Sequence, residues 1–190
     1  MATTELYRVY SGELEVRTKG DGRTVFGHAV PWATPVRIDS RLTEQFRSGA
    51  FEAQHSSAHR IRLAHEHVAL GGKLIGAMSL MRVDAAGQYV EARVSKTRDG
   101  DDALELVNDG ALRYFSVGFR EGQNRSLRVS GIGEVTERVT ATMFELALTS
   151  TPAYGEGSSV HGTRSVQQAL ANLDEARQIL AGLPMLPAAV

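Results

Sequence analysis

The chain has 190 residues with 21 basic and 22 acidic side chains, which is enough for one domain with a core and a short appendage. Because the charges nearly balance, the chain has no net electrostatic attraction to nucleic acid or to a membrane surface. The lack of cysteine excludes disulfides, thiolate zinc sites and a cysteine nucleophile. The sequence shows neither the apolar core of a signal peptide nor 18 successive apolar residues, so we expect a soluble intracellular protein.

The first third of the chain alternates between apolar and polar residues, which predicts strands. Residues 5–17 and 23–32 fit two strands joined by a turn around residues 19–22, Lys-Gly-Asp-Gly. Residues 42–51, LTEQFRSGAF, have room for one or two helical turns. Residues 59–67, HRIRLAHEH, alternate again and predict a strand whose apolar side carries two histidines.

The middle of the chain predicts a hairpin and a helix. Residues 73–83 and 88–96 alternate on either side of a turn at residues 84–87. Residues 101–110, DDALELVNDG, begin with acidic residues, carry apolar residues at helical spacing and end on Gly110. These are the start and stop signals of a capped helix.

Two later segments again have the pattern of strands: residues 111–119, ALRYFSVGF, and residues 137–149, ERVTATMFELALT. Many alternating segments and few helices predict a mainly β fold with a few packed helices, in the α+β class. An antiparallel, closed or partly closed β-barrel is the expected way for such a domain to protect its sheet edges.

The C-terminal part of the chain differs in composition from this β-domain, which we assign to residues 1–155. Residues 156–164 are rich in glycine and serine and predict a linker. Residues 165–182 carry an apolar stripe at helical spacing and predict an amphipathic helix, followed by a short tail at residues 183–190.

The strand at residues 111–119 carries the first candidate for chemistry. Alternation places Ser116 and Gly118 on one face, opposite a Phe-Val-Phe face that must enter a core. Gly118 removes a side chain beside the serine, which would leave room for a ligand backbone. The alternative is that Ser116 is a tolerated small residue and Gly118 a bulge. A serine acts as a nucleophile only beside an activating base.

His65 and His67 are the candidate bases. Two histidines on one inward face must each find a hydrogen-bond partner. A His-x-His pair on a strand can also supply two zinc ligands, although the sequence does not indicate a third. A serine hydrolase and a metal-dependent hydrolase are therefore both open on the residues alone.

Glu145 is the third candidate. Alternation places it with Met143 and Ala147 on one face of the strand at residues 137–149. It is either an ordinary surface acid or a carboxylate that orients a histidine and stabilises its protonated form. A histidine, Ser116 and Glu145 on three separate strands would make a catalytic triad.

Five segments occur in an order that carries a family resemblance: GHAVPW, EQFRSGAF, IRLAHEH, LELVNDGALRYFSVGF and FELALTSTPA. Together they resemble the prohead (capsid maturation) proteases of tailed bacteriophages, whose fold is related to that of the herpesvirus assembly proteases. The resemblance covers residues 25–153, and its most specific part is Ser-Val-Gly-Phe after Asn-Asp-Gly-Ala-Leu-Arg.

The resemblance implies that Ser116 is the nucleophile, that the family's histidine falls on His67 and that Glu145 takes the third position. The family usually has aspartate or glycine after the histidine, where this chain has Val68. That departure keeps His65 as the alternative base. The implied activity is hydrolysis of peptide bonds through an acyl-enzyme, with no cofactor and no metal.

The resemblance also implies partners and a place of action. The family's substrates are the scaffold or the scaffold-like part of the phage major capsid protein, and often the protease itself, inside the assembling prohead in the host cytoplasm. The herpesvirus relatives suggest a homodimer. The helix at residues 165–182 either docks on scaffold or capsid protein or packs against its own domain or a second copy. The alternative function is a non-enzymatic assembly factor that grips a capsid peptide with the same face.

Overall fold

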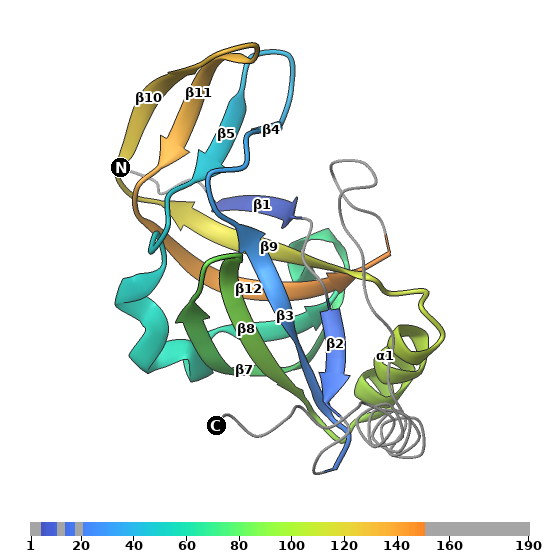
Figure 1. Ribbon diagram of the computed structural model, residues 1–190. Coiled ribbons are helices and arrows are strands. Elements are labelled where there is room, and N and C mark those ends of the chain that lie inside the picture. The colour runs from blue at the N-terminus through green and yellow to red at the C-terminus, as the bar shows by residue number, and fades with distance from the viewer. Residues whose placement is uncertain (1–4, 11–13, 18–20, 151–190) are drawn as a thin grey trace, which may run out of the picture.

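The computed structural model describes residues 5–10, 14–17 and 21–150 of the chain (Figure 1). Within these residues the chain forms two β-sheets, one α-helix and two 3₁₀ helices. The predicted linker at residues 156–164, the predicted helix at residues 165–182 and the tail at residues 183–190 lie outside the described residues.

The larger sheet consists of β1 (Glu5–Tyr10), β2 (Leu14–Arg17), β3 (Thr24–Pro31), β6 (Arg62–His65), β7 (Lys73–Val83), β8 (Gly87–Val94), β9 (Tyr114–Glu121) and β12 (Ala141–Thr149). Its strand order is β1-β9-β12-β6-β7-β8-β3-β2, and its pairs are antiparallel except the parallel pair of β12 and β6. Figure 1 shows this sheet curling round as an open half-barrel. The structure thus confirms the predicted mainly β, partly closed architecture.

The smaller sheet consists of β4 (Val36–Arg37), β5 (Thr43–Phe46), β10 (Asn124–Val129) and β11 (Gly133–Arg138), in the order β10-β11-β5-β4. It projects beyond the end of the larger sheet where β1 lies (Figure 1). Here β11 and β5 run parallel. The helical turns predicted for residues 42–51 are wrong over β5, because this segment is held in a sheet by partners distant in the sequence.

Within the described part of the chain, three helices lie between strands, and each leads into a strand of the larger sheet. The 3₁₀ helices η1 (Glu52–Arg60) and η2 (Val68–Leu70) lie on either side of β6, and α1 (Arg98–Asn108) precedes β9. The predicted helix is confirmed, although it begins earlier than expected. Thr97 caps it, since its hydroxyl accepts a hydrogen bond from the Gly100 amide at 3.2 Å.

A cluster of aromatic rings holds the smaller sheet against the larger one. Phe46 of β5 stacks on Phe51 and meets Phe119 of β9 edge-on, with ring centroids 5.1 Å apart in both pairs. All three rings are fully buried. Burial of such rings is worth about 3–5 kcal/mol each against truncation to alanine. One face of β9 is therefore fixed in the core, as predicted, and the opposite face carries Ser116.

The hairpin of β7 and β8 and the pairing of β2 with β3 confirm two predicted pairings. Three predicted strands have wrong bounds. Residues 5–17 divide into β1, which pairs with β9, and β2; residues 59–67 contain only the four-residue β6 after η1; and residues 137–149 divide between β11 and β12, in different sheets. In each case the apolar–polar alternation of the sequence continues past the end of a strand, so period two alone does not reveal where the strand ends.

Candidate active site

Three adjacent strands, β9, β12 and β6, carry small side chains side by side on one face of the larger sheet. In register, Ser116 of β9 lies opposite Ala147 of β12, which lies opposite Ala64 of β6. Both alanines are fully buried, but neither belongs to the hydrophobic core on the other face. This row leaves room for a ring to lie over the strands and reach Ser116.

That ring is His67, which comes just after β6. The strand ends at His65, and Glu66 turns the chain with a positive φ of 55°. The Glu66 carboxylate accepts a hydrogen bond from the Thr149 hydroxyl at 3.0 Å, which ties the turn to the end of β12. Gly72 closes the loop, since its amide donates to the His67 carbonyl at 3.0 Å. A Cβ at Gly72 would lie 2.2 Å from the backbone carbonyl oxygen of Glu66, so a side chain does not fit there.

The structure brings His67, Ser116 and Glu145 into one chain of hydrogen bonds. His67 Nε2 lies 2.5 Å from Ser116 Oγ, and His67 Nδ1 lies 2.6 Å from Glu145 Oε1. When Nδ1–H donates to the carboxylate, Nε2 carries no proton and accepts a hydrogen bond from the Ser116 hydroxyl. All three are buried, with exposed fractions of 1% for Ser116, 5% for His67 and 0% for Glu145.

A β-bulge in β12 turns Glu145 toward this site. Met143 lies opposite Phe119 in register and Glu145 lies opposite Gly118, so Phe144 is the extra residue. Met143 consequently packs in the core with Phe119, while Glu145 shares the face of Gly118 and Ser116. The prediction that Met143 and Glu145 share a face is wrong, because the bulge shifts the alternation by one residue.

Arg62 is a polar neighbour of the site that sequence reasoning missed. It lies opposite Glu145 across β6 and β12, and its Nε donates to Glu145 Oε2 at 2.6 Å. Burial alone would raise the pKa of Glu145, but the hydrogen bond from His67 and the positive charge of Arg62 outweigh it and hold the pKa below its ordinary value. Glu145 is therefore a carboxylate at neutral pH. Only the parallel register of the two strands could have identified Arg62.

Two aromatic rings occupy the space beside Gly118. A Cβ at Gly118 would lie 3.0 Å from the Phe144 ring and 3.1 Å from the Tyr7 ring. The Tyr7 ring also meets His67 edge-on, with centroids 4.5 Å apart. The expectation that Gly118 leaves room for a ligand backbone is therefore wrong in this structure, because the glycine makes room for these two rings.

His65 does not join the site. It is the last residue of β6, half-buried, and lies opposite Lys73 of β7 and Leu148 of β12. The prediction that His65 and His67 share one strand face is wrong, because the turn at Glu66 separates them. Both ring nitrogens of His67 are already hydrogen-bonded, and the described residues contain no cluster of three or more histidine, cysteine, aspartate or glutamate side chains that could hold a metal ion.

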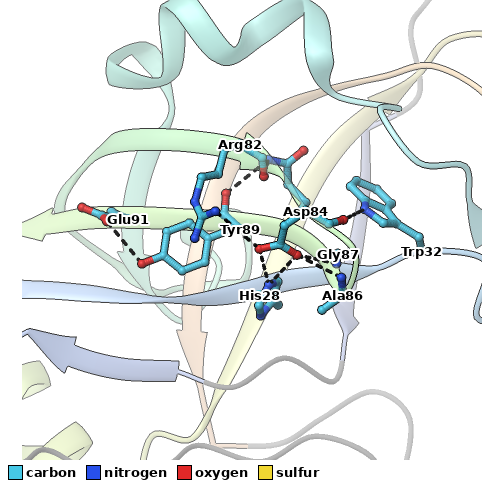
Figure 2. Close-up of polar contacts among 9 residues, drawn as sticks. His28, Trp32, Arg82, Asp84, Ala86, Gly87, Tyr89 and Glu91 are labelled. Atoms are coloured by element: carbon cyan, nitrogen blue, oxygen red, sulfur yellow. Dashed lines mark hydrogen bonds and ion pairs between the residues drawn. The ribbon is translucent and has the colours of Figure 1, made fainter. Parts of the chain in front are cut away.

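A second histidine–carboxylate pair lies elsewhere in the sheet, at the turn between β7 and β8 (Figure 2). His28 Nε2 lies 2.9 Å from both carboxylate oxygens of Asp84, and the Ala86 and Gly87 amides donate to the same carboxylate. Burial alone would raise the pKa of Asp84, but these hydrogen bonds outweigh it and lower the pKa. No serine or threonine hydroxyl within the described part of the chain bonds this pair, whose contacts close the hairpin turn.

Comparison with known proteins gives a matching family model and, among the solved structures, a capsid assembly protease. The family model described as "Caudovirus prohead serine protease" matches residues 12–172. A search of curated proteins found no match. The solved structure of the bacteriophage T4 capsid assembly protease aligns with 9% identity and a TM-score of 0.45, over 84% of this chain and 98% of that chain. Within the described residues, no helix is long and apolar enough to span a membrane.

Proposed function

The chain belongs to the caudovirus prohead serine protease family, and we propose that it is an endopeptidase whose nucleophile, base and orienting acid are Ser116, His67 and Glu145. The observation that carries the proposal is the continuous hydrogen-bond chain from Ser116 Oγ through both nitrogens of His67 to Glu145. A nucleophile bonded to a base that is oriented by a third group is the arrangement that covalent catalysis of this kind needs.

Acylation begins when Ser116 Oγ attacks the carbonyl carbon of the scissile peptide bond and its proton passes to His67 Nε2. The resulting imidazolium is stabilised by Glu145, whose negative charge faces Nδ1. The tetrahedral intermediate then collapses, the C–N bond breaks and His67 returns the proton to the leaving amine. The acyl group stays on Ser116 as an ester.

Deacylation repeats these steps with water. His67 takes a proton from a water molecule while the water oxygen attacks the ester carbonyl carbon. His67 then gives this proton to Ser116 Oγ as the C–O bond breaks. The products are a carboxylic acid and the free serine. Throughout, Glu145 keeps its charge, because Arg62 and His67 favour the ionised form.

The substrates that we propose are the scaffold or the scaffold-like part of the major capsid protein, together with the protease chain itself. Family membership supports this choice, since prohead proteases take their name from the particle in which they act. Cleavage would then take place inside the assembling prohead. Dimerisation and docking through residues 165–182 stay predictions from the sequence.

The test of this function is coexpression with the major capsid protein of the same phage, followed by gel and mass analysis for a shortened product. Ser116→Ala should abolish processing, with a loss on the order of a millionfold if the three residues act as one unit. Normal processing by the variant would disprove the nucleophile assignment. Binding of the capsid protein without cleavage by the wild-type chain would instead support an assembly factor.

The two histidines give a matched pair of variants. His67→Gln should reduce turnover about as much as Ser116→Ala, whereas His65→Gln should leave it within about threefold of wild type, because only His67 contacts the nucleophile. The reverse result would identify His65 as the base. Metal analysis of the purified proteins tests the alternative. About one zinc per chain in the wild type, absent from both variants, would favour a metal hydrolase instead.

A further inference from the structure

The proposed nucleophile is closed off in this structure. Ser116 is 1% exposed, and the His67 ring that bonds it is 5% exposed. A peptide carbonyl must come within about 3–3.5 Å of Ser116 Oγ before attack can occur. Some element beside Ser116 must therefore move before a protein substrate can enter.

The element beside Ser116 on the outer side is β1. Among the strands that the structure describes, it is the end strand of the larger sheet and is paired there with β9 (Figure 1). In register, Val9 lies opposite Ser116 and Tyr7 opposite Gly118. On the other side β9 is bounded by β12, which carries Glu145 and cannot leave without dismantling the site. Removal of β1 would expose the backbone edge of β9 directly at the nucleophile. A free strand edge binds an extended peptide through main-chain hydrogen bonds.

Two side chains fasten β1 in place. Tyr7 packs edge-on against His67 and against Phe144, with centroids 4.5 Å and 5.6 Å apart. On the neighbouring residue, Arg8 Nε donates at 2.7 Å to the fully buried Glu44 of β5. Tyr7 thus fills the space beside the triad, and Arg8 anchors the strand to the smaller sheet.

The strand also lies outside the part of the chain that carries the site. The family match begins at residue 12, after the end of β1, whereas all three site residues lie within the matched range. The triad hydrogen bonds and the Arg62–Glu145 pair include no atom of β1. Loss of β1 would therefore leave the catalytic groups and their direct hydrogen-bond partners in the chain.

From these observations, and resting on the proposed function, we infer that β1 occupies the place of the substrate strand and keeps the protease inactive until it is displaced. The substrate is an extended peptide segment that pairs with the edge of β9 after β1 has left. It presents a side chain to the space between His67 and Phe144 that Tyr7 fills in this structure. Tyr7 and Arg8 set the free energy of this displacement.

A reversible covalent lock tests the inference directly. The double variant Glu5→Cys, Arg120→Cys places cysteines at positions that lie opposite each other in register, and the chain has no cysteine of its own. Opposed residues in antiparallel strands have Cα atoms about 4.5–5.5 Å apart, within the range that a disulfide spans. The readout is the rate at which a rhodamine-tagged fluorophosphonate labels Ser116, with Ser116→Ala as the unlabelled control. In that reaction the serine oxygen bonds phosphorus, fluoride leaves and the serine proton passes to His67.

The oxidised variant should label at least about tenfold more slowly than the same protein after reduction, and the reduced protein should label at the wild-type rate. Two full-length variants that loosen β1 should have the opposite effect. Tyr7→Ala and Arg8→Gln should each accelerate labelling about tenfold, since each removes a contact that holds the strand. A synthetic peptide of residues 2–13 should slow labelling of the loosened variants competitively.

The outcomes separate the inference from the proposed function. Equal rates for the oxidised and reduced lock, or slower labelling of Tyr7→Ala and Arg8→Gln in folded protein, would show that β1 supports the site and would overturn the inference while leaving the protease assignment intact. Absence of labelling in the wild type, the reduced lock and both loosened variants would disprove Ser116 as an activated nucleophile and the inference with it. If the lock does not fold, the two loosened variants decide alone.

Discussion

Glu145 is a charged group buried on a sheet face, and its partners determine how it behaves. Its two carboxylate oxygens are divided between His67 and Arg62, which hold its pKa below the ordinary value although burial opposes this. A carboxylate with a lowered pKa in the folded state stabilises the fold at pH values above its unfolded pKa. That contribution is lost as the pH falls through the lowered, folded-state pKa.

The variant Glu145→Gln tests both roles of this residue. Turnover should fall on the order of ten-thousandfold, because a neutral amide neither fixes the tautomer of His67 nor stabilises the imidazolium. The difference in unfolding free energy between wild type and variant should be largest near pH 7. It should shrink as the pH falls below about 4.5, the ordinary value for glutamate, since protonated Glu145 then resembles glutamine. Urea unfolding of both proteins at pH 7, 5, 4 and 3 measures this, and a constant difference would contradict the assignment of charge.

At the scale of elements, the pairing of β6 with β12 is what orients the acid. These strands run parallel, so Arg62 faces Glu145 directly, and one guanidinium nitrogen fixes the oxygen that does not bond His67. The Arg62 guanidinium also lies 5.6 Å from the centre of the ring of Phe144, the extra residue of the bulge that turns Glu145 toward the site. In the proposed mechanism, Arg62 is therefore a positioning residue that acts through Glu145.

Arg62→Met should lower kcat by about tenfold to a hundredfold and leave KM nearly unchanged, because the acid loses its orientation but no substrate contact is removed. Arg62→Lys should recover part of kcat, since it restores the charge without the fixed geometry of the guanidinium. Arg60→Met, an exposed arginine two positions earlier, is the matched control and should retain wild-type kinetics. An increase in KM alone for Arg62→Met would show that Arg62 binds substrate instead.

The sequence predicted those elements of the site that depend on local pattern. The strand with Ser116, the helix before it and the β7–β8 hairpin follow from alternation and capping residues, and they are present in the structure. Glu145 was already a candidate acid on the residues alone, and a family motif selected His67 over His65 and gave Glu145 the third position. Alternation alone placed both histidines on one face and Glu145 beside Met143, and both placements were wrong.

Two local irregularities explain these errors. The positive φ at Glu66 and the extra residue Phe144 each interrupt period two at the point where a functional side chain must be turned toward Ser116. Neither has a strong sequence signal: glutamate is an uncommon residue with positive φ, and phenylalanine is ordinary in a strand. Long-range pairs such as β1 with β9 are also invisible to local pattern, and these pairs close the site.

At the scale of the whole molecule, buried charges join the two sheets. Arg138 of β11 donates to the buried Glu44 through Nε at 2.9 Å and through Nη2 at 2.6 Å, and it reaches Glu121 of β9 through Nη1 at 2.5 Å. Glu44 also accepts a hydrogen bond from Arg8 of β1. Both links run from the smaller sheet to the two strands at the edge of the larger one, so the smaller sheet holds β1 and β9 in place beside the site.

Arg138→Met should consequently destabilise the folded chain by about 3–5 kcal/mol, since it removes one partner of a fully buried carboxylate and leaves that charge poorly compensated. Arg128→Met, in the exposed strand β10, is the matched control and should change stability by less than about 0.5 kcal/mol. Urea unfolding monitored by circular dichroism measures both. Arg138 makes two hydrogen bonds to Glu44 and a third to Glu121, whereas Arg8 makes a single bond to Glu44 from the end strand. Arg138→Met should therefore weaken the whole fold, whereas Arg8→Gln should mainly free β1 and accelerate labelling of Ser116. A loss below about 1 kcal/mol for Arg138→Met would mean that the aromatic cluster alone holds the sheets together.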